Sequence, residues 1–123
     1  MVLDRGKLRR TILRAVGLLV TGQYRVLGAV SKDRGMSEAD MAEAVRSYPY
    51  RLAMPPDERL EALVDVDEDV IPIPEATPPG MAVDVRLWDV DEGTPRSDLR
   101  LCMWLTEGPG ELYDIEVRSI HAM

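Results

Sequence analysis

The stretch LRLCMWLT, residues 99–106, decides the fold class, because large aliphatic side chains occupy every second position in it. Alternation with a period of two is typical of a β-strand that buries one face. The same alternation occurs in MAVDVRLW (81–88) and in LYDIEVRSI (112–120), and the turn sequence GPG (108–110) precedes the last segment. We therefore predict a three-stranded antiparallel meander with one apolar face.

The spacing of these strands predicts which residues lie opposite one another. If Leu105 faces Tyr113, then Met103 faces Ile115 on the apolar side of the sheet. On the other side two arginines meet, and like charges directly opposite are unfavourable, so we expect an acidic residue beside them, with Asp84 as one candidate. The pairs predicted on this other side are Trp104 with Asp114, Cys102 with Glu116, and Arg100 with Arg118.

The first half of the chain predicts helices. Residues 4–20 carry apolar side chains at spacings of three and four, as in an amphipathic helix. The apolar patch at 24–30 either continues this helix or forms a short second one. Ser37 is a suitable N-cap for a further helix, which Pro49 ends. We expect one α+β domain over residues 1–123, with two N-terminal helices packed on the C-terminal meander, which could belong to a larger curved sheet.

The segment between these halves leaves alternatives open. YRLAM (50–54) resembles a short strand, and PPDE (55–58) suits the start of a helical turn. Four prolines exclude a central strand over residues 72–79, because proline cannot donate to the hydrogen-bond ladder.

Charge is distributed unevenly along this acidic chain, whose net charge is −7. Residues 1–34 hold eight Lys or Arg against two acids, and residues 35–123 hold seven Arg against twenty acids. The acidic body argues against a nucleic-acid partner. Apolar runs are shorter than the roughly 18 residues that cross a bilayer, so we expect a cytoplasmic protein without a membrane partner. We interpret the basic helix face of Lys7, Arg10 and Arg14 as solvated or neutralised by the acidic body.

Three aspartates stand two residues apart, as at the first, third and fifth positions of a calcium loop: Asp65, Asp67 and Asp69. Such a loop next requires a glycine and later a bidentate glutamate, where this chain has Val70 and Ala76. We interpret the three as solvated acids. Zinc sites usually use several cysteine and histidine ligands, and this chain has one of each. We therefore expect no metal and no cofactor.

Cys102 and His121 would be the natural nucleophile–base pair. Cys102 lies on the polar side of its strand, whereas His121 shares the parity of Tyr113 on the apolar side of its own. Side chains on opposite faces of one sheet cannot touch unless a β-bulge intervenes. The sequence also lacks the motifs of serine hydrolases, phosphate loops and dinucleotide-binding folds. We therefore expect no catalytic residue.

Two tryptophans are predicted on the sheet face opposite the apolar one, where polar residues are the rule. Tryptophan and arginine are common hot-spot residues of interfaces. This face either binds a protein partner or a second copy of the chain, or is covered by another part of the same chain. The candidate binding residues are Trp88, Trp104, Arg86, Arg100, Asp114, Glu116 and Arg118.

The basic N-terminal helix, the second helix and the segments RSDLRLCMWL and GELYDIEVRSIHAM resemble small bacterial α+β domains. They are also similar to the cone-shaped nuclear-transport-factor and cystatin-like superfamily, over the first helix and residues 81–123. That superfamily includes ketosteroid isomerases, ligand-binding domains and dimerisation domains, and its enzymes place an acid inside the cone.

The interpretation that combines these features is a non-enzymatic protein-interaction module, for example an acidic immunity-like or accessory protein. The alternative that the resemblance implies is a cone-fold small-molecule binder or enzyme. This alternative requires a pocket with a buried carboxylate, and the strand acids able to supply one are Asp84, Asp114 and Glu116.

Overall fold

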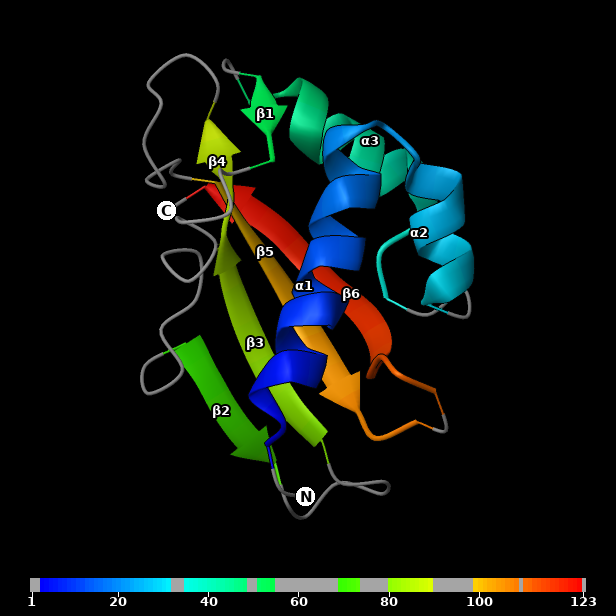
Figure 1. Cartoon of the computed structure of the whole chain (residues 1–123). Helices are drawn as coiled ribbons and strands as arrows, with labels where there is room; N and C mark the ends of the chain where they lie inside the picture. The colour runs from blue at the N-terminus through cyan, green and yellow to red at the C-terminus, as the bar shows by residue number, and fades with distance from the viewer. Residues whose placement is uncertain are drawn as a thin grey trace.

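The computed structural model of the 123-residue chain describes residues 3–31, 35–48, 51–54, 69–73, 80–89, 99–108 and 110–122. Within these residues helices come first along the chain and strands follow, as Figure 1 shows. The elements are α1 (Arg5–Val20), α2 (Tyr24–Val30), α3 (Glu38–Arg46), β1 (Leu52–Ala53), β2 (Val70–Ile73), β3 (Gly80–Arg86), β4 (Trp88–Asp89), β5 (Leu99–Thr106) and β6 (Asp114–Ala122).

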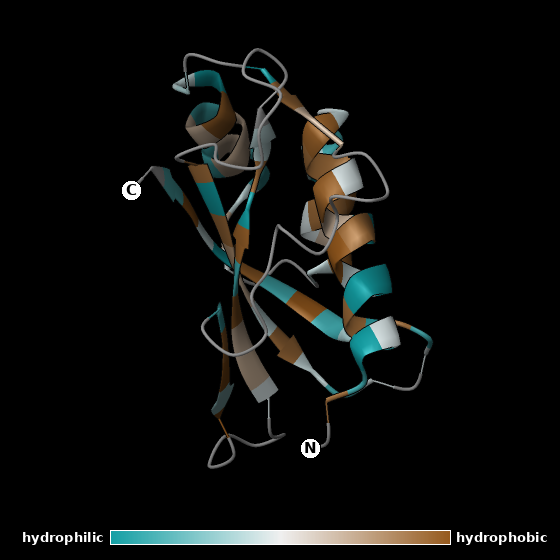
Figure 2. Cartoon of the chain, turned by 60° about the vertical axis from the view of Figure 1, so that its left-hand side comes forward, coloured by the Kyte–Doolittle hydropathy of each residue, from teal (hydrophilic) through white to brown (hydrophobic). Residues whose placement is uncertain are grey.

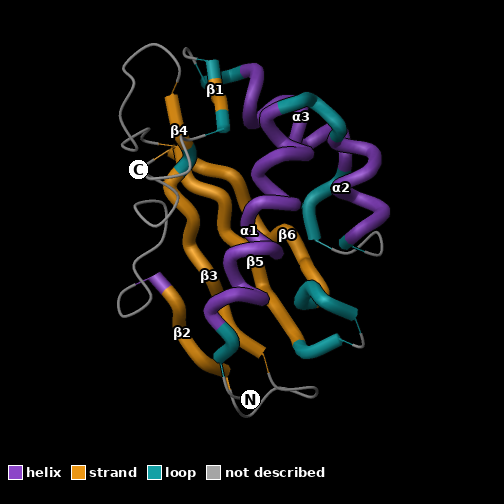
Figure 3. Tube along the Cα trace, viewed as in Figure 1, coloured by secondary structure: helices purple, strands orange, loops and turns teal. Residues whose placement is uncertain are grey.

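The main sheet is antiparallel and four-stranded, in the order β2-β3-β5-β6, which confirms the predicted α+β class and the β3-β5-β6 meander. α1 lies across one face of this sheet, and α2 and α3 lie beside β6 (Figures 1 and 3). β2 is an edge strand, which is where its Pro72 can be tolerated. β1 and β4 pair separately as a two-stranded sheet, so the short strand suggested for residues 50–54 is confirmed.

α1 begins and ends where the local sequence directs it. The Asp4 side chain accepts a hydrogen bond of 3.0 Å from the Lys7 N–H and thereby caps the first turn. After Val20 the chain leaves the helix at Gly22, whose φ of 73° suits glycine. The apolar side chains of α1 are buried at the spacing of a helical stripe and include Leu8, Ile12, Ala15, Val16 and Leu19.

The alternation in the strands separates two faces of the main sheet. The inner face packs against α1 and is apolar, and Figure 2 shows hydrophobic residues on α1 and on the strands. Burying each such side chain contributes about 1.5–3 kcal/mol to folding. Buried inner-face residues include Met81, Val83, Val85, Leu99, Leu101, Met103, Leu105, Ile115 and Val117. We call the opposite side the outer face, and it carries the residues that alternate with these.

The predicted register between β5 and β6 is wrong by two positions, because Leu105 lies opposite Ile115 rather than Tyr113. Tyr113 precedes the strand and is held by α1 instead. Its backbone N–H donates to Oγ1 of Thr11 over 3.0 Å, and its hydroxyl accepts from the Asp4 N–H over 3.0 Å. This attachment lengthens the β5–β6 connection beyond the tight turn that GPG suggested.

A β-bulge shifts the same register once more. Met103 lies opposite Val117, but Cys102 lies opposite Ser119, so Arg118 is the extra residue of β6. Because a bulge inserts one residue, the side chains beyond it in the longer strand lie on the opposite face from the one that regular alternation predicts. Ser119 and His121 consequently lie on the outer face, whereas Ile120 is buried.

The connection between α2 and α3 is fastened to the edge of the sheet at β6. The Met36 N–H donates to the Val117 carbonyl over 2.8 Å, and Gly35 has a φ of 76°. The apolar patch at 24–30 forms the separate helix α2, which settles the alternative left open by the sequence. The Ser37 side chain accepts from the Asp40 N–H over 3.1 Å, which confirms the predicted N-cap.

The segment 81–88 is not one strand, as the sequence suggested. β3 ends at Arg86, the Leu87 N–H donates to the Leu99 carbonyl over 3.1 Å, and Trp88 pairs with Ala53 in the small sheet. The suggested helical turn after residue 55 and most of the acidic stretch, including Asp65 and Asp67, lie outside the described residues.

Candidate functional site on the outer face of the sheet

Antiparallel pairing arranges the outer face in rows, because directly opposed residues project to the same side. One row crosses all four strands of the main sheet, and two further rows cross three strands each. The rows are Ile71, Ala82, Trp104 and Glu116; then Asp84, Cys102 and Ser119; then Arg86, Arg100 and His121.

Trp104 has a fixed position in the first row. A Cβ placed on Gly80 would lie 2.2 Å from Nε1 of Trp104, so the indole ring covers the backbone of this glycine. The Arg118 guanidinium lies 5.6 Å from the ring centroid, within the range of a cation–π interaction. Arg118 is itself held by Glu116, with 2.6 Å between Nη1 and Oε2. The ring is thus held by contacts with Gly80 and Arg118 and remains partly exposed.

The surface beside Trp104 is apolar. Ile71 on β2 has 60% of its surface exposed, and Ala82 stands between it and Trp104 in the same row. Aliphatic and aromatic groups therefore continue across three strands on the side that α1 leaves free. Sequence reasoning missed Ile71, although its flanking residues Val70 and Pro72 mark a strand edge.

In the other rows, two aspartates lie within ion-pair distance of Arg100. Arg100 lies opposite Arg86, and its Nη1 is 3.0 Å from Oδ2 of Asp84 and 3.7 Å from Oδ1 of Asp69. The expectation of an acid beside Arg100 is therefore confirmed, with Asp69 as a further acid. Arg118 does not face Arg100, because the register differs by two positions from the predicted one and the bulge then leaves Arg118 without an opposite residue.

The prediction that Cys102 and His121 lie on opposite faces is wrong, because the bulge brings His121 to the outer face. The Cys102 sulfur lies 3.9 Å from Nδ1 of His121, and the Ser119 hydroxyl lies 3.2 Å from the same nitrogen. The thiol also donates to Oδ1 of Asp84 over 3.1 Å.

This environment does not activate the thiol. Burial and then the hydrogen bond to Asp84 raise the pKa of Cys102 from 9.0 to about 11. A nucleophilic cysteine needs a lowered pKa, because the thiolate is the reactive form. The cluster thus has the residue types of a catalytic triad but the electrostatics of a hydrogen-bonded, protonated thiol.

Acidic side chains on the outer face do not converge into a metal site. Among the described residues, no group of three or more His, Cys, Asp or Glu side chains is arranged to hold a metal ion. Asp84, Asp114 and Glu116 all belong to the outer face, opposite the side that packs against α1. Asp114 lies beside the β5–β6 loop, where a Cβ on Gly108 would come within 2.6 Å of its Oδ1.

Trp88 does not share a surface with Trp104. It is only 8% exposed and belongs to β4 in the small sheet. Ala82 lies opposite Trp104, and Trp88 follows six residues later, which corresponds to about 20 Å along an extended chain. The predicted grouping of the two tryptophans is therefore wrong, because the strand that contains Ala82 ends before Trp88.

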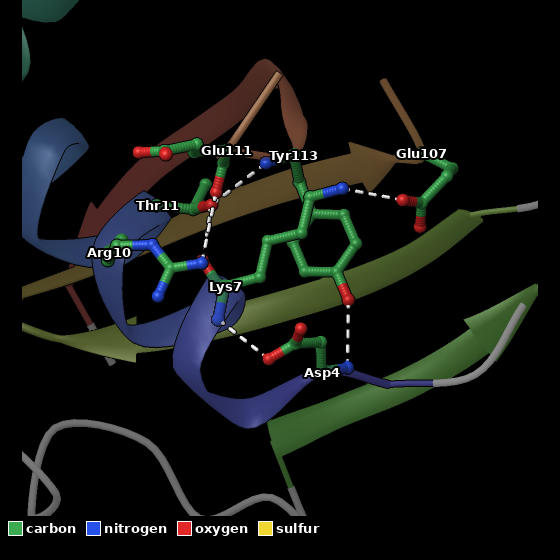
Figure 4. A network of polar contacts seen from close by, with 7 residues as sticks. All are labelled: Asp4, Lys7, Arg10, Thr11, Glu107, Glu111 and Tyr113. Carbon is green, nitrogen blue, oxygen red and sulfur yellow. Dashed lines mark hydrogen bonds and ion pairs between the residues drawn. The ribbon is translucent and has the colours of Figure 1, made fainter. Parts of the chain in front are cut away.

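On the basic side of α1, the predicted neutralisation by the acidic body is confirmed at Lys7, which pairs with Glu107 as Figure 4 shows. Lys7 is buried, with its Nζ 2.5 Å from Oε1 of Glu107 and 4.7 Å from the centroid of the Tyr113 ring. The Thr11 hydroxyl donates to the Lys7 carbonyl over 2.7 Å and accepts from the Tyr113 N–H. We call Asp4, Lys7, Thr11, Glu107 and Tyr113 the α1 anchor, because they attach the start of α1 to the end of β5 and the start of β6.

The fold and the outer face define a small α+β domain in which a helix covers one sheet face and the other presents aromatic, aliphatic and charged groups. The family model described as Domain of unknown function (DUF7668) matches residues 16–123, and the chain belongs to this family. No curated protein and no solved structure shows significant similarity to the chain. None of the described helices is long and apolar enough to cross a membrane.

Proposed function

We propose that the protein is a non-enzymatic protein-interaction module that binds its partner with the outer face of the main sheet. The observation that carries this proposal is the row formed by Ile71, Ala82 and Trp104, an apolar surface on a sheet face that is ordinarily polar. An exposed apolar patch with polar groups around it is typical of an interaction site.

The polar groups around this row suit a protein partner. Arg118 and Trp104 belong to the residue types that contribute most to interface affinity. Glu116 fixes Arg118 over the indole before any partner arrives, so little side-chain entropy is lost on binding. Asp84 and Arg100 neutralise each other at the side of the patch, which lowers the cost of removing them from water.

The charge of the chain restricts the partner. With a net charge of −7 the protein repels acidic surfaces and attracts basic ones over about a Debye length. The proposed ligand is therefore a neutral or basic protein surface. An immunity-like or accessory role would involve a partner of this kind. A cytoplasmic location is part of the proposal, because a free thiol such as that of Cys102 stays reduced there.

A cone-fold small-molecule binder or enzyme is the alternative, and the positions of the acids favour it less. Such an activity needs a carboxylate in a pocket between helix and sheet. Asp84, Asp114 and Glu116 belong instead to the outer face, and the inner face carries buried apolar side chains. The raised pKa of Cys102 likewise gives no support to a thiol-dependent reaction.

The experiment compares the wild type with Ile71→Asp, which places a charge in the patch without emptying a buried site. Light scattering at several concentrations first shows whether the chain binds itself. The two proteins are then immobilised and exposed to extract of the source cells, and the retained proteins are quantified by mass spectrometry. We expect Ile71→Asp to reduce the retained amount of a specific partner, or the self-association of the chain, about tenfold relative to the wild type.

The matched control is Val26→Asp, because Val26 is also exposed but lies on α2, away from the outer face. It should leave association unchanged. Equal retention by the wild type and Ile71→Asp, with no self-association, would refute the outer face as the binding surface. Circular dichroism of all three proteins checks that the fold is the same.

A further inference from the structure

The exposed side of α1 carries four arginines, which are Arg5, Arg9, Arg10 and Arg14. The helix itself contains no acidic residue. Arg10 donates to the Glu111 carbonyl over 3.4 Å, and none of the other three forms an ion pair with a side chain in the described ranges. Figure 2 shows the N-terminal end of α1 as hydrophilic and its C-terminal end as hydrophobic.

These arginines form two rows. Arg5 and Arg9 are four residues apart, as are Arg10 and Arg14, so each pair lies along one side of the helix. Gly6, Leu13 and Gly17 lie between the two rows, because they follow one another at intervals of seven and four residues. The strip continues to Met54, which is 39% exposed and whose sulfur lies 4.0 Å from where a Cβ on Gly17 would be.

We propose that this surface, the arginine strip, binds an acidic segment of a partner protein. Carboxylates of the segment pair with the two arginine rows, and an apolar side chain of the segment covers Leu13 and Met54. The planar guanidinium group matches a carboxylate with two parallel hydrogen bonds and loses its hydration more readily than an ammonium group. Clusters of arginine recognise acidic and phosphorylated motifs in this way.

The α1 anchor contributes to this binding by holding the helix in place. Lys7 and Tyr113 fasten the inner side of the turns whose outer side carries the arginines. A surface on a fixed helix loses less conformational entropy on binding than a surface on a loop. Lys7 is turned inward, so the exposed cations of α1 are all arginines.

Charge complementarity selects a short acidic segment over a long polyanion. From Arg5 to Arg14 the helix rises about 14 Å. Nucleic acid or an anionic membrane extends well beyond this length. Its further negative charges would be repelled by the rest of a protein whose net charge is −7. Charges separated by more than about 8 Å are largely screened at physiological salt, so a short segment is attracted locally without that repulsion.

The arginine strip is independent of the proposed outer-face site. Its four arginines precede Val16, where the match to the family begins, whereas the outer-face residues all lie within the match. The inference therefore concerns this chain rather than the family.

The test measures the binding of a short fluorescent peptide, with Asp and Glu on both sides of a central leucine, by fluorescence anisotropy. The variants are Arg5→Ala/Arg9→Ala and Arg10→Ala/Arg14→Ala, one for each row. The matched control is Arg25→Ala/Arg46→Ala, which removes the same charge from exposed positions on α2 and α3. We expect each row variant to weaken binding about tenfold and the control to change it less than about twofold.

Four comparisons decide the outcome. A peptide with Asn and Gln in place of the acids should not bind, and binding of the acidic peptide should weaken as salt is raised. Equal loss in the control variant would show a general charge effect and overturn the proposal. Tighter binding of single-stranded DNA or of anionic vesicles than of the peptide, lost in the row variants, would assign the surface to a different ligand and overturn it as well.

Discussion

The thiol of Cys102 donates its hydrogen bond to Asp84, 3.1 Å away, while Nδ1 of His121 is 3.9 Å from the sulfur. We expect Cys102 to titrate near pH 11 in a measurement of thiolate absorbance against pH. Asp84→Asn should lower this pKa, because the carboxylate accepts a hydrogen bond from the protonated thiol and repels the thiolate. Ser119→Ala should raise it, because the Ser119 hydrogen bond stabilises the thiolate. Titration near pH 9 in the wild type would contradict the geometry.

The same thiol makes stability depend on alkaline pH. Its pKa in the folded protein is about 11, above the ordinary value of 9.0, so the unfolded chain loses this proton first. The contribution of the thiol is therefore constant below pH 9.0, falls as pH rises to about 11, and is level above that. The free energies of unfolding of the wild type and of Cys102→Ser, measured with urea, should diverge only in this window. A constant difference across the window would show that the folded protein does not hold the proton.

Two glycines with positive φ allow a matched comparison. A Cβ on Gly35 would lie 2.0 Å from the Val117 carbonyl oxygen, whereas a Cβ on Gly22 would have nothing within 4 Å. Gly22→Ala should thus cost only the left-handed backbone term of about 1–2 kcal/mol. Gly35→Ala should cost about 2–4 kcal/mol, because it also displaces the loop that hydrogen-bonds to β6. Equal losses in urea unfolding would show that the Met36–Val117 contact contributes nothing.

The ion pair of the α1 anchor joins a buried Lys7 to a half-exposed Glu107, so it should contribute more than a pair in which both side chains are exposed. Glu107→Gln leaves the Lys7 cation buried beside the Tyr113 ring, so we expect a loss of about 1 kcal/mol, limited by the exposure of Glu107. Glu43→Gln removes an exposed helical pair with Arg46 and should cost less than about 0.5 kcal/mol. Thermal unfolding of the two variants under identical conditions gives the comparison. A smaller loss for Glu107→Gln than for Glu43→Gln would contradict the anchor.

Alternation was sufficient to predict the inner face, because a period of two follows directly from strand geometry. It also placed Asp84 beside Arg100 correctly, since β3 and β5 pair without interruption. The bulge in β6 was missed because the count assumed a regular strand. The signal was present, since Ile115 and Val117 are followed by Ile120, three positions on rather than two.

The remaining errors come from contacts between distant parts of the chain. Tyr113 lies outside the ladder because Thr11, about a hundred residues earlier in the chain, takes its backbone N–H. Lys7 shares a helical side with other basic residues but is buried against Glu107 and Tyr113, which lie between β5 and β6 in the chain. A pattern within one segment carries no information about such partners. Trp104, Glu116 and Arg118 could therefore be placed on one face, whereas the contact of the indole with Gly80 could not be predicted.

The contact of Trp104 with Gly80 gives the last prediction. Gly80→Ala should destabilise the protein by about 1–3 kcal/mol, because the new methyl group would meet the indole and the Leu105 carbonyl. In a Trp104→Ala background the same change should cost less, since only the carbonyl contact remains, and the double-mutant cycle should give a coupling of about 1 kcal/mol. Unfolding by urea, followed by circular dichroism, measures all four proteins. Additive losses would mean that the indole ring does not contact Gly80. The proposed binding role of Trp104 would then lose its support, because it depends on a ring held in a fixed position.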